Sequence, residues 1–466
     1  MFDMADNDVY QDVIGQFPIL MSYTPLAYLF PWNAEKLSQE AVVSDLKTAA
    51  DKLILLFPWL GLRVTNVATE PGAFEAQMAP WPAGTEPESI VTANDLTDKM
   101  PSYDEFSTAN CPLSLLDGQL ICPYGGFPAR HDEAKLGPAP VVAIRANFIT
   151  GGILLVFMAH HNIIDAAGLF RLMIHMSVIM NGHELASEDV KQGNRDRRKV
   201  VRLLDHGTKP RRDHGYLLPP SPAAPPPPSS ASTAQWAIFR VRKSALAQIK
   251  AQATPARVKG EPYTNITLDD AVSAFYWKRL STVRVCNKGF PPSTRSKFSR
   301  AIDARVLVGV PESYLGHMVY SCFTYLSFGQ VVHELSLAEI ASRLRADLNE
   351  AYTEHAVRCY VTFLAREVKR EDRSRLAYCG PFDRRTDVSS SSVAGFTELM
   401  ELAFGRLGRP RCLRRPATVP ALPGVLYVMP PDPGSEDPVL VVCLDEEDLE
   451  GLIMDEEWAE ACEYIG

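Results

Sequence analysis

Two adjacent histidines and a nearby aspartate form the group in this 466-residue sequence most suited to acid–base chemistry. His160 and His161 end the apolar run 153–160, and Asp165 follows His161 by four residues. Imidazole titrates near neutral pH, so a histidine at a strand end can take a proton from a hydroxyl or thiol and return it. Asp165 can orient that ring, or it can cap the next helix and pair with an arginine. The spacing leaves both uses open, and it also allows a strand end whose polar residues only touch water.

The flanking sequence places these residues between a strand and a helix. The apolar runs 141–149 and 153–160 are separated by Thr-Gly-Gly, which predicts a hairpin. The run 166–180 has helical spacing and follows Asp165, a favourable residue at a helix N-terminus. Small residues in the turn, among them Gly168, would fix the backbone and leave room for a substrate. The histidines are therefore expected at a strand-to-helix turn.

The rest of the chain mixes predicted strands and helices. Helical spacing and turn residues predict further elements at the following places: a helix over 41–57 ending before Pro58, a strand over 235–241, a helix after Thr267, Asp269 and Asp270, two late strands near 425–429 and 438–444, and an acidic closing helix over 444–465. The strands are spaced too irregularly for strict β-α-β alternation. An α/β fold with mixed sheets is predicted.

A proline-rich stretch divides the chain into halves of similar size. Residues 219–230 contain seven prolines in twelve positions, so they can form neither a helix nor a central strand. Such a stretch is typical of an exposed, semi-rigid connector. We expect an N-terminal domain over 1–215, a crossover linker over 216–235 and a C-terminal domain over 236–466.

Composition excludes several classes of function. A net charge of −9 provides no basic surplus for nucleic acid, and the short basic segment 194–202 contains an acid. The longest apolar runs are about half of what a membrane span needs, and the acidic N-terminus does not resemble a signal peptide. The nine scattered cysteines form no C-x-x-C pair, so no metal site is expected. We expect a cytoplasmic protein that binds neither nucleic acid nor membrane.

Several segments, in the same order along the chain, resemble the BAHD-type, CoA-dependent acyltransferases. The HHxxxD signature of that family matches residues 160–165, with Gly168 behind it. Further matches are FPWLGLRV (57–64), CPLSLLDG (111–118), TLDDAVSAFYW (267–277), AIDAR (301–305), YLGH (314–317) and DEEWAEACEYIG (455–466). The last of these resembles the fungal branch that contains trichothecene 3-O-acetyltransferase. The matches cover nearly the whole chain.

This resemblance implies a fold and a set of roles. The fold would be two similar chloramphenicol-acetyltransferase-like α/β domains joined by a long crossover, with the active-site channel between them. His161 would be the general base that deprotonates an acceptor hydroxyl, while Asp165 and Gly168 would support the motif and Arg305 would pair with Asp165. His160 would be a packing residue. An acyl-CoA, with acetyl-CoA expected, would be the co-substrate of a monomeric enzyme.

The second signature of the family, DFGWG, is altered in this chain. The sequence reads AFGRLGRP over 403–410, so Ala403 stands in place of the aspartate, and Val393 stands where the family often has tryptophan. Loss of the aspartate would free or re-pair an arginine, and the valine would widen the acceptor channel. Among the serines of 389–392, Ser391 and Ser392 are candidates to donate to the oxyanion or the substrate. Three nearby arginines are candidates to bind CoA phosphates: Arg406, Arg409 and Arg411.

Three hypotheses of function follow. The first is transfer of an acyl group, with acetyl expected, from CoA to a hydroxyl of a fungal secondary metabolite such as a terpenoid or polyketide. The second keeps His161 as a base but uses it for CoA-independent cyclisation, condensation or elimination. The third is a binding protein without catalytic activity. Release of free thiol from acetyl-CoA separates the first from the other two.

Overall fold

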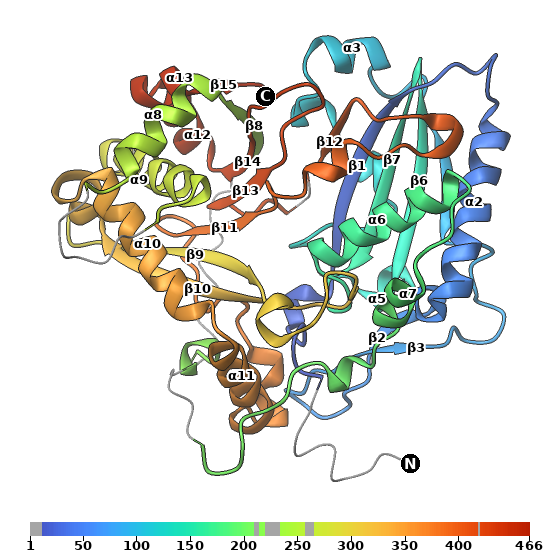
Figure 1. The fold of residues 1–466 in the computed structure, drawn as a ribbon, viewed down its shortest axis with the longest axis horizontal. Coiled ribbons are helices and arrows are strands. Elements are labelled where there is room, and N and C mark those ends of the chain that lie inside the picture. The colour runs from blue at the N-terminus through green and yellow to red at the C-terminus, as the bar shows by residue number, and fades with distance from the viewer. Residues whose placement is uncertain (1–11, 209–213, 220–233, 257–264, 418–419) are drawn as a thin grey trace.

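The computed structural model describes residues 12–208, 214–219, 234–256, 265–417 and 420–466. Figure 1 shows two large sheets side by side, one formed mainly by the first half of the chain and the other by the second half. The proline-rich segment expected as a crossover linker lies almost wholly outside the described residues. The division into an N-terminal and a C-terminal domain remains our proposal for how the chain is organised.

The N-terminal sheet has five strands in the order β12-β1-β7-β6-β4. Its bounds are β12 Cys412–Arg414, β1 Tyr23–Pro31, β7 Gly152–His160, β6 Val142–Ile149 and β4 Val91–Asp95. β6 and β7 form the antiparallel hairpin that the two apolar runs predict, with Ile149 opposite Gly152. β7 is the central strand of the sheet and is buried along its whole length. It ends at His160, so His161 follows directly after it.

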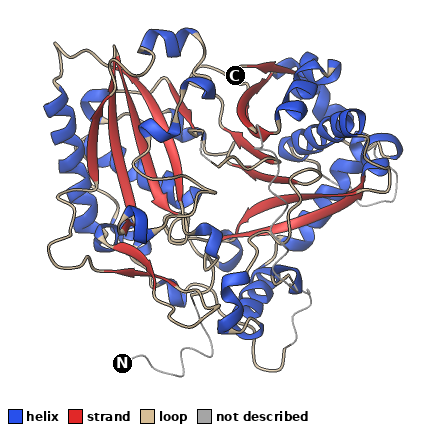
Figure 2. Ribbon diagram, turned by 180° about the vertical axis from the view of Figure 1, so that it is seen from behind, coloured by secondary structure: helices blue, strands red, loops and turns tan. Residues whose placement is uncertain are grey.

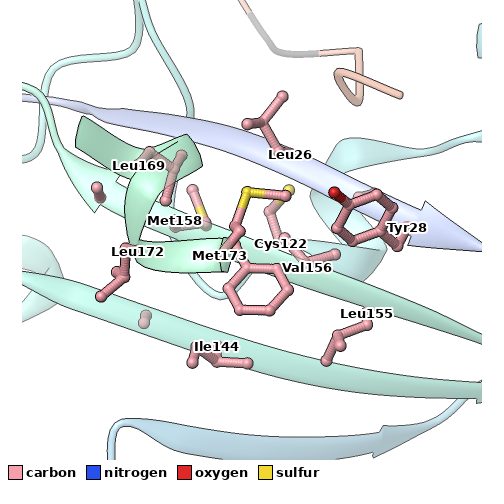
Figure 3. Close-up of a cluster of buried hydrophobic side chains, with 14 of the residues drawn as sticks. Leu26, Tyr28, Cys122, Ile144, Leu155, Val156, Met158, Leu169, Leu172 and Met173 are labelled. Atoms are coloured by element: carbon pink, nitrogen blue, oxygen red, sulfur yellow. The ribbon is translucent and has the colours of Figure 1, made fainter. Parts of the chain in front are cut away.

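Two helices pack with this sheet. α2 (Gln39–Leu56) begins after Ser38, whose hydroxyl accepts from the Ala41 amide, and ends before Pro58, as predicted. α6 (Ala166–Met180) begins after Asp165, the cap that the sequence predicts. Figure 3 shows Leu169 and Met173 of α6 among buried side chains of β1, β6 and β7. This apolar contact fixes the start of α6, and with it the turn that follows His161.

The C-terminal sheet has seven strands in the order β10-β9-β11-β13-β14-β8-β15. Its bounds are β10 Val319–Ser327, β9 Arg295–Asp303, β11 Val388–Ser392, β13 Val425–Met429, β14 Val439–Leu444, β8 Gln235–Val241 and β15 Cys462–Tyr464. Figure 2 shows helices gathered on the outer side of this sheet, away from the N-terminal sheet. These helices are α8 Lys243–Ala253, α9 Leu268–Lys288, α10 Leu337–Ala351, α12 Glu446–Met454 and α13 Glu456–Ala461.

One strand from the second half of the chain joins the first sheet. β12 pairs with β1, placing Leu413 opposite Tyr28, and the segment before it packs into the same core through Phe404. The remaining elements lie around the two sheets: β2 Arg63–Asn66, β3 Ala76–Ala79, β5 Ala139–Pro140, α3 Tyr103–Thr108, α4 Gly118–Ile121, α5 Glu133–Leu136, α7 Ser187–Gly193 and α11 Glu354–Thr362. The two halves are thus tied together by sheet pairing as well as by contacts.

The prediction of one closing helix over 444–465 is wrong. The segment contains α12 and α13, and Asp455 between them caps α13 by accepting from the Trp458 amide. The last residues leave helical structure because β15 pairs with the edge of β8, where Cys462 lies opposite Val241. The pairing partner lies more than 200 residues away, so local periodicity could not reveal it.

Within the described part of the chain, no helix has the length and apolar character that a membrane crossing needs. In the same residues, no group of three or more histidine, cysteine, aspartate or glutamate side chains could hold a metal ion.

Candidate active site

His161 lines a cavity of about 180 Å³ that lies between the two sheets. The first half of the chain contributes Thr24, Phe127 and Ala166 to its wall. The second half contributes residues of β9, β10, β11 and β13, together with two loop segments; among them are Ser299, Ser321, Tyr378, Cys379, Phe382, Ser391, Arg415 and Tyr427. The cavity therefore has the place expected of a channel between two domains.

The backbone around His161 is held by hydrogen bonds from three distant segments. The His161 amide donates to the Ser22 carbonyl over 2.8 Å, and Nδ1 of His317 lies 2.9 Å from the His161 carbonyl oxygen. The side-chain Nδ2 of Asn162 donates to the Gly15 carbonyl, and Arg197 donates to the backbone carbonyl of Asn162 over 3.0 Å. A ring carried by a backbone fixed in this way loses little freedom when a substrate binds.

The His161 ring has a lowered pKa. Burial lowers the pKa of His161 to about 4; the opposing charge of Asp165 limits the effect and the charge of Arg415 adds to it. The imidazole is therefore neutral at pH 7 and able to accept a proton. Its Nδ1 is buried, and the residue borders the cavity.

We expect the pH dependence of the transfer rate to follow this pKa. Because the base is active when neutral, kcat/KM should be level between pH 8 and 6 and should fall as the pH approaches about 4. Initial rates over this range, with circular dichroism at each pH to confirm the fold, would check the prediction. An acid limb centred near the ordinary histidine value of 6.5 would contradict it.

Asp165 points away from this chemistry into a buried ion pair. Its two carboxylate oxygens accept from Arg305 over 2.8 and 3.0 Å, and they also accept from the backbone amides of Gly168 and Met318. Burial alone would raise the pKa of Asp165, but Arg305 and the other donors hold it below its usual value. Arg305 in turn donates to the carbonyls of Tyr314 and Gly316. The pair joins the start of α6 to the segment 305–318.

Gly168 allows that segment to approach the first turn of α6. A Cβ at this position would lie 2.1 Å from the Leu315 carbonyl oxygen and 2.9 Å from Cγ2 of Ile164. Backbone cannot yield as a flexible side chain can, so any larger residue must push the segment 305–318 away.

We expect Gly168→Ala to destabilise the protein by about 1–3 kcal/mol through this overpacking. Gly395→Ala is the matched control, because a Cβ at Gly395 meets no atom within 4 Å. Denaturant midpoints of the two variants would check the prediction. Equal midpoints would show that the close approach at Gly168 is not required.

The structure separates the two candidate serines. Ser391 lines the His161 cavity, whereas Ser392, at the end of β11, lines a different cavity with Arg300 and Arg345. Successive residues of a strand point to opposite faces, which explains the separation. Ser391 thus shares a cavity with His161 and Ser392 does not, and the role of either serine as an oxyanion donor stays a prediction.

The three arginines predicted to bind CoA phosphates lie apart from the His161 cavity. Arg406 pairs with Asp45 on α2, and Arg409 pairs with Glu401. Arg411 lies 3.3 Å from the Ser107 hydroxyl. Their role toward CoA stays a prediction.

Neither alteration of the family signatures reaches the cavity wall. Ala403 uses its carbonyl to accept from the side chains of Ser177 and Asn181, on and after α6. The next residue, Phe404, packs in the core of the N-terminal sheet. Val393 packs beside the same core, and its amide donates to the Val428 carbonyl. At Val393 the structure therefore shows core packing and not the wider channel that was expected.

Two histidines flank His161, and both are buried. His160 packs edge-on against Tyr23, with ring centroids 5.2 Å apart, and burial holds its pKa well below the usual value. His317 faces the His161 ring at 5.2 Å. Sequence reasoning assigned no role to His317, although it belongs to the YLGH segment that resembles the family. Its Nδ1 lies 2.9 Å from the His161 carbonyl oxygen, so it contacts the backbone that carries the His161 ring.

The sequence matches two protein families. Residues 22–178 match the family described as "Trichothecene 3-O-acetyltransferase-like N-terminal domain", and residues 128–460 match the "Transferase family". The chain is 36% identical to the O-acetyltransferase azaD of Aspergillus niger, covering 100% of this chain and 98% of that protein. It is 38% identical to the O-acyltransferase pigD of Monascus ruber, covering 99% of this chain and 100% of that protein.

A solved structure has the same fold. The trichothecene 3-O-acetyltransferase TRI101 of Fusarium sporotrichioides, in complex with coenzyme A and T-2, superposes with a TM-score of 0.84 at 26% identity. The match covers 98% of this chain and 100% of that one. The predicted α/β fold with mixed sheets is confirmed, and the match is consistent with a two-domain arrangement. The protein belongs to the BAHD acyltransferase family, in the branch with a trichothecene 3-O-acetyltransferase-like N-terminal domain.

Proposed function

We propose that this protein transfers an acyl group from CoA to a hydroxyl of a small molecule, with His161 as the general base. The observation that carries the proposal is the neutral, half-buried imidazole of His161 in a cavity formed by both halves of the chain. The superposed relative was solved with coenzyme A and a small-molecule acceptor together, which supports the same pair of ligands here.

In the reaction, His161 takes the proton of the acceptor hydroxyl while the hydroxyl oxygen attacks the thioester carbonyl. The carbonyl oxygen becomes an oxyanion, and the Ser391 hydroxyl in the cavity wall donates to it. Collapse of the tetrahedral intermediate breaks the C–S bond. The CoA thiolate leaves with the proton from His161, which returns the base to its neutral form.

The relatives indicate the class of both substrates. Those named azaD and epaC are O-acetyltransferases, and pigD is an O-acyltransferase; all three are fungal. We propose acetyl-CoA as the donor and a fungal secondary metabolite, such as a polyketide or terpenoid, as the acceptor. A monomeric, cytoplasmic enzyme belongs to the same proposal.

A second cavity offers CoA a route toward His161. It measures about 340 Å³ and shares Ala301 and Ser390 with the His161 cavity. Its other lining residues include Arg300 and Arg345, beside the start of α9. β9 and β11 pair only up to Arg300 and Ser390, so the two strands part where the cavities meet. We propose this opening as the path of the pantetheine arm.

Calorimetry with CoA, followed by a thiol-release assay with acetyl-CoA and a panel of polyketide and terpenoid alcohols, tests the function. We expect CoA binding and acceptor-dependent release of thiol. Absence of both would overturn the proposal and would favour the CoA-independent reaction or the binding protein.

A further inference from the structure

Arg415 differs from the other buried arginines of the described structure because it lacks a carboxylate partner. The others each form an ion pair with an N–O distance between 2.6 and 2.9 Å: Arg284 with Asp448, Arg300 with Asp270, Arg305 with Asp165, and Arg414 with Asp432. Arg415 is 5% exposed, and its Nη1 has no hydrogen-bond partner among the described residues. A buried cation left unpaired is costly, so its retention calls for an explanation.

The guanidinium of Arg415 is held in the cavity wall by aromatic rings. It lies 4.7 Å above the ring of Tyr427 and 5.5 Å from that of Trp236. Its Nη2 donates to the Phe127 carbonyl over a long 3.3 Å, while the Phe127 ring packs edge-on against His161 at 5.8 Å. Arg415 and His161 are thus joined through one residue, and the charge of Arg415 contributes to the low pKa of His161.

This position does not suit the phosphates of CoA. The reacting thioester must reach His161, and the long pantetheine arm then separates it from the pyrophosphate and the ribose phosphate. A cation close enough to act on His161 therefore meets the acceptor or the acyl group. An acyl group such as acetyl is neutral, and the oxyanion that forms on its carbonyl is transient, which leaves the acceptor as the source of a permanent negative charge.

We propose that Arg415 binds an anionic oxygen of the acceptor, a carboxylate on a planar aromatic ring, and so holds its hydroxyl toward His161. Aromatic side chains line the same cavity and provide flat walls for such a ring: Phe127, Tyr378, Phe382 and Tyr427. A guanidinium binds a carboxylate through paired hydrogen bonds, and an internal aspartate at this place would compete with the ligand. This inference names the acceptor class and rests on the function proposed above.

Binding of a matched pair of probes tests the inference separately from catalysis. The probes are 3-hydroxybenzoate and its methyl ester, which differ in charge but keep the ring and the hydroxyl. By calorimetry, the wild-type protein should bind the acid more tightly than the ester. Arg415→Gln should weaken binding of the acid by at least about tenfold and leave the ester nearly unchanged. The affinity of Arg415→Lys for the acid should lie between those of the wild type and Arg415→Gln, because lysine keeps the charge but lacks the paired N–H donors of a guanidinium.

Arg242→Gln is the matched control. Arg242 donates to the carbonyls of Ala459 and Glu460 and does not line the cavity, so both probes should bind as in the wild type. Equal binding of acid and ester by the wild type would overturn the inference. So would an equal loss of both probes in Arg415→Gln, which would assign Arg415 to packing.

These outcomes are independent of the proposed function. Thiol release with normal CoA binding, but without any preference for the acid, would retain the acyltransferase and reject the anionic acceptor. A preference for the acid that depends on Arg415, in a protein that does not bind CoA, would retain the anionic ligand and reject the acyltransferase.

Discussion

Replacing His161 by alanine should lower kcat for acyl transfer by about 10²–10⁴-fold, because the acceptor hydroxyl then loses the base that removes its proton. The loss should appear in kcat and not in the affinity for CoA, because the imidazole accepts the hydroxyl proton during the chemical step. Thiol release under saturating acetyl-CoA would measure the loss, and calorimetry would show that CoA still binds.

The control for this variant addresses the fold. Burial keeps the His161 ring neutral, so its removal leaves no unpaired charge. The denaturation midpoint should therefore change little. A variant that keeps wild-type kcat would remove His161 from the mechanism. A variant that loses both kcat and the native circular dichroism spectrum would need replacement by His161→Gln, which preserves volume.

The largest effect on stability is expected at the ion pair between Asp165 and Arg305. Arg305→Met should cost about 3–5 kcal/mol, because it leaves the Asp165 carboxylate buried without its cation. Asp165→Asn should lower the free energy of unfolding less than Asp165→Ala would. Asparagine can still accept a hydrogen bond from the Gly168 amide and cap α6, whereas alanine cannot. Urea denaturation midpoints of the two variants would measure these losses.

The double variant Asp165→Asn with Arg305→Met separates the pair from its surroundings. It should be more stable than Arg305→Met alone, because the fully buried carboxylate at position 165 is gone, and Asp303, which also pairs with Arg305, is exposed enough to be solvated. The pH dependence has a definite sign: the pKa of Asp165 is lowered in the fold, so the pair stabilises the protein above the ordinary value of 3.8 and this stabilisation is lost as the pH falls below it. Full solubility and stability in Arg305→Met, with loss of kcat alone, would instead give the pair a catalytic role.

Local signals in the sequence were sufficient for the turn that carries His161. The apolar run before it forms β7, and Asp165 caps α6, because both features depend on residues close in sequence. The helix expected after Thr267, Asp269 and Asp270 forms as α9, but it begins earlier, at Leu268, because Thr267 and Asp270 form a capping box. The pairing of Asp165 with Arg305 joins residues 140 positions apart, and only the family resemblance indicated it.

Other features depend on contacts that no local pattern records. Arg414 and Arg415 are adjacent in the sequence, but only Arg414 forms an ion pair, with Asp432. The packing of distant strands distinguishes the two arginines, and no local pattern in the sequence does. The pairing of β12 with β1 and of β15 with β8 likewise joins residues more than 200 positions apart. Val393 was expected at the channel because its role was taken from a family pattern, whereas the surrounding residues place it against the core.

Transfer of an isotope-labelled acetyl group tests the central claim most directly. The wild-type protein is incubated with labelled acetyl-CoA and a hydroxyl acceptor identified by thiol release, and the product is analysed by mass spectrometry. Our account predicts a labelled ester on the acceptor with the wild type and almost none with His161→Ala. Label that appears only as free acetate, or an equal yield of ester from the His161→Ala variant, would contradict it.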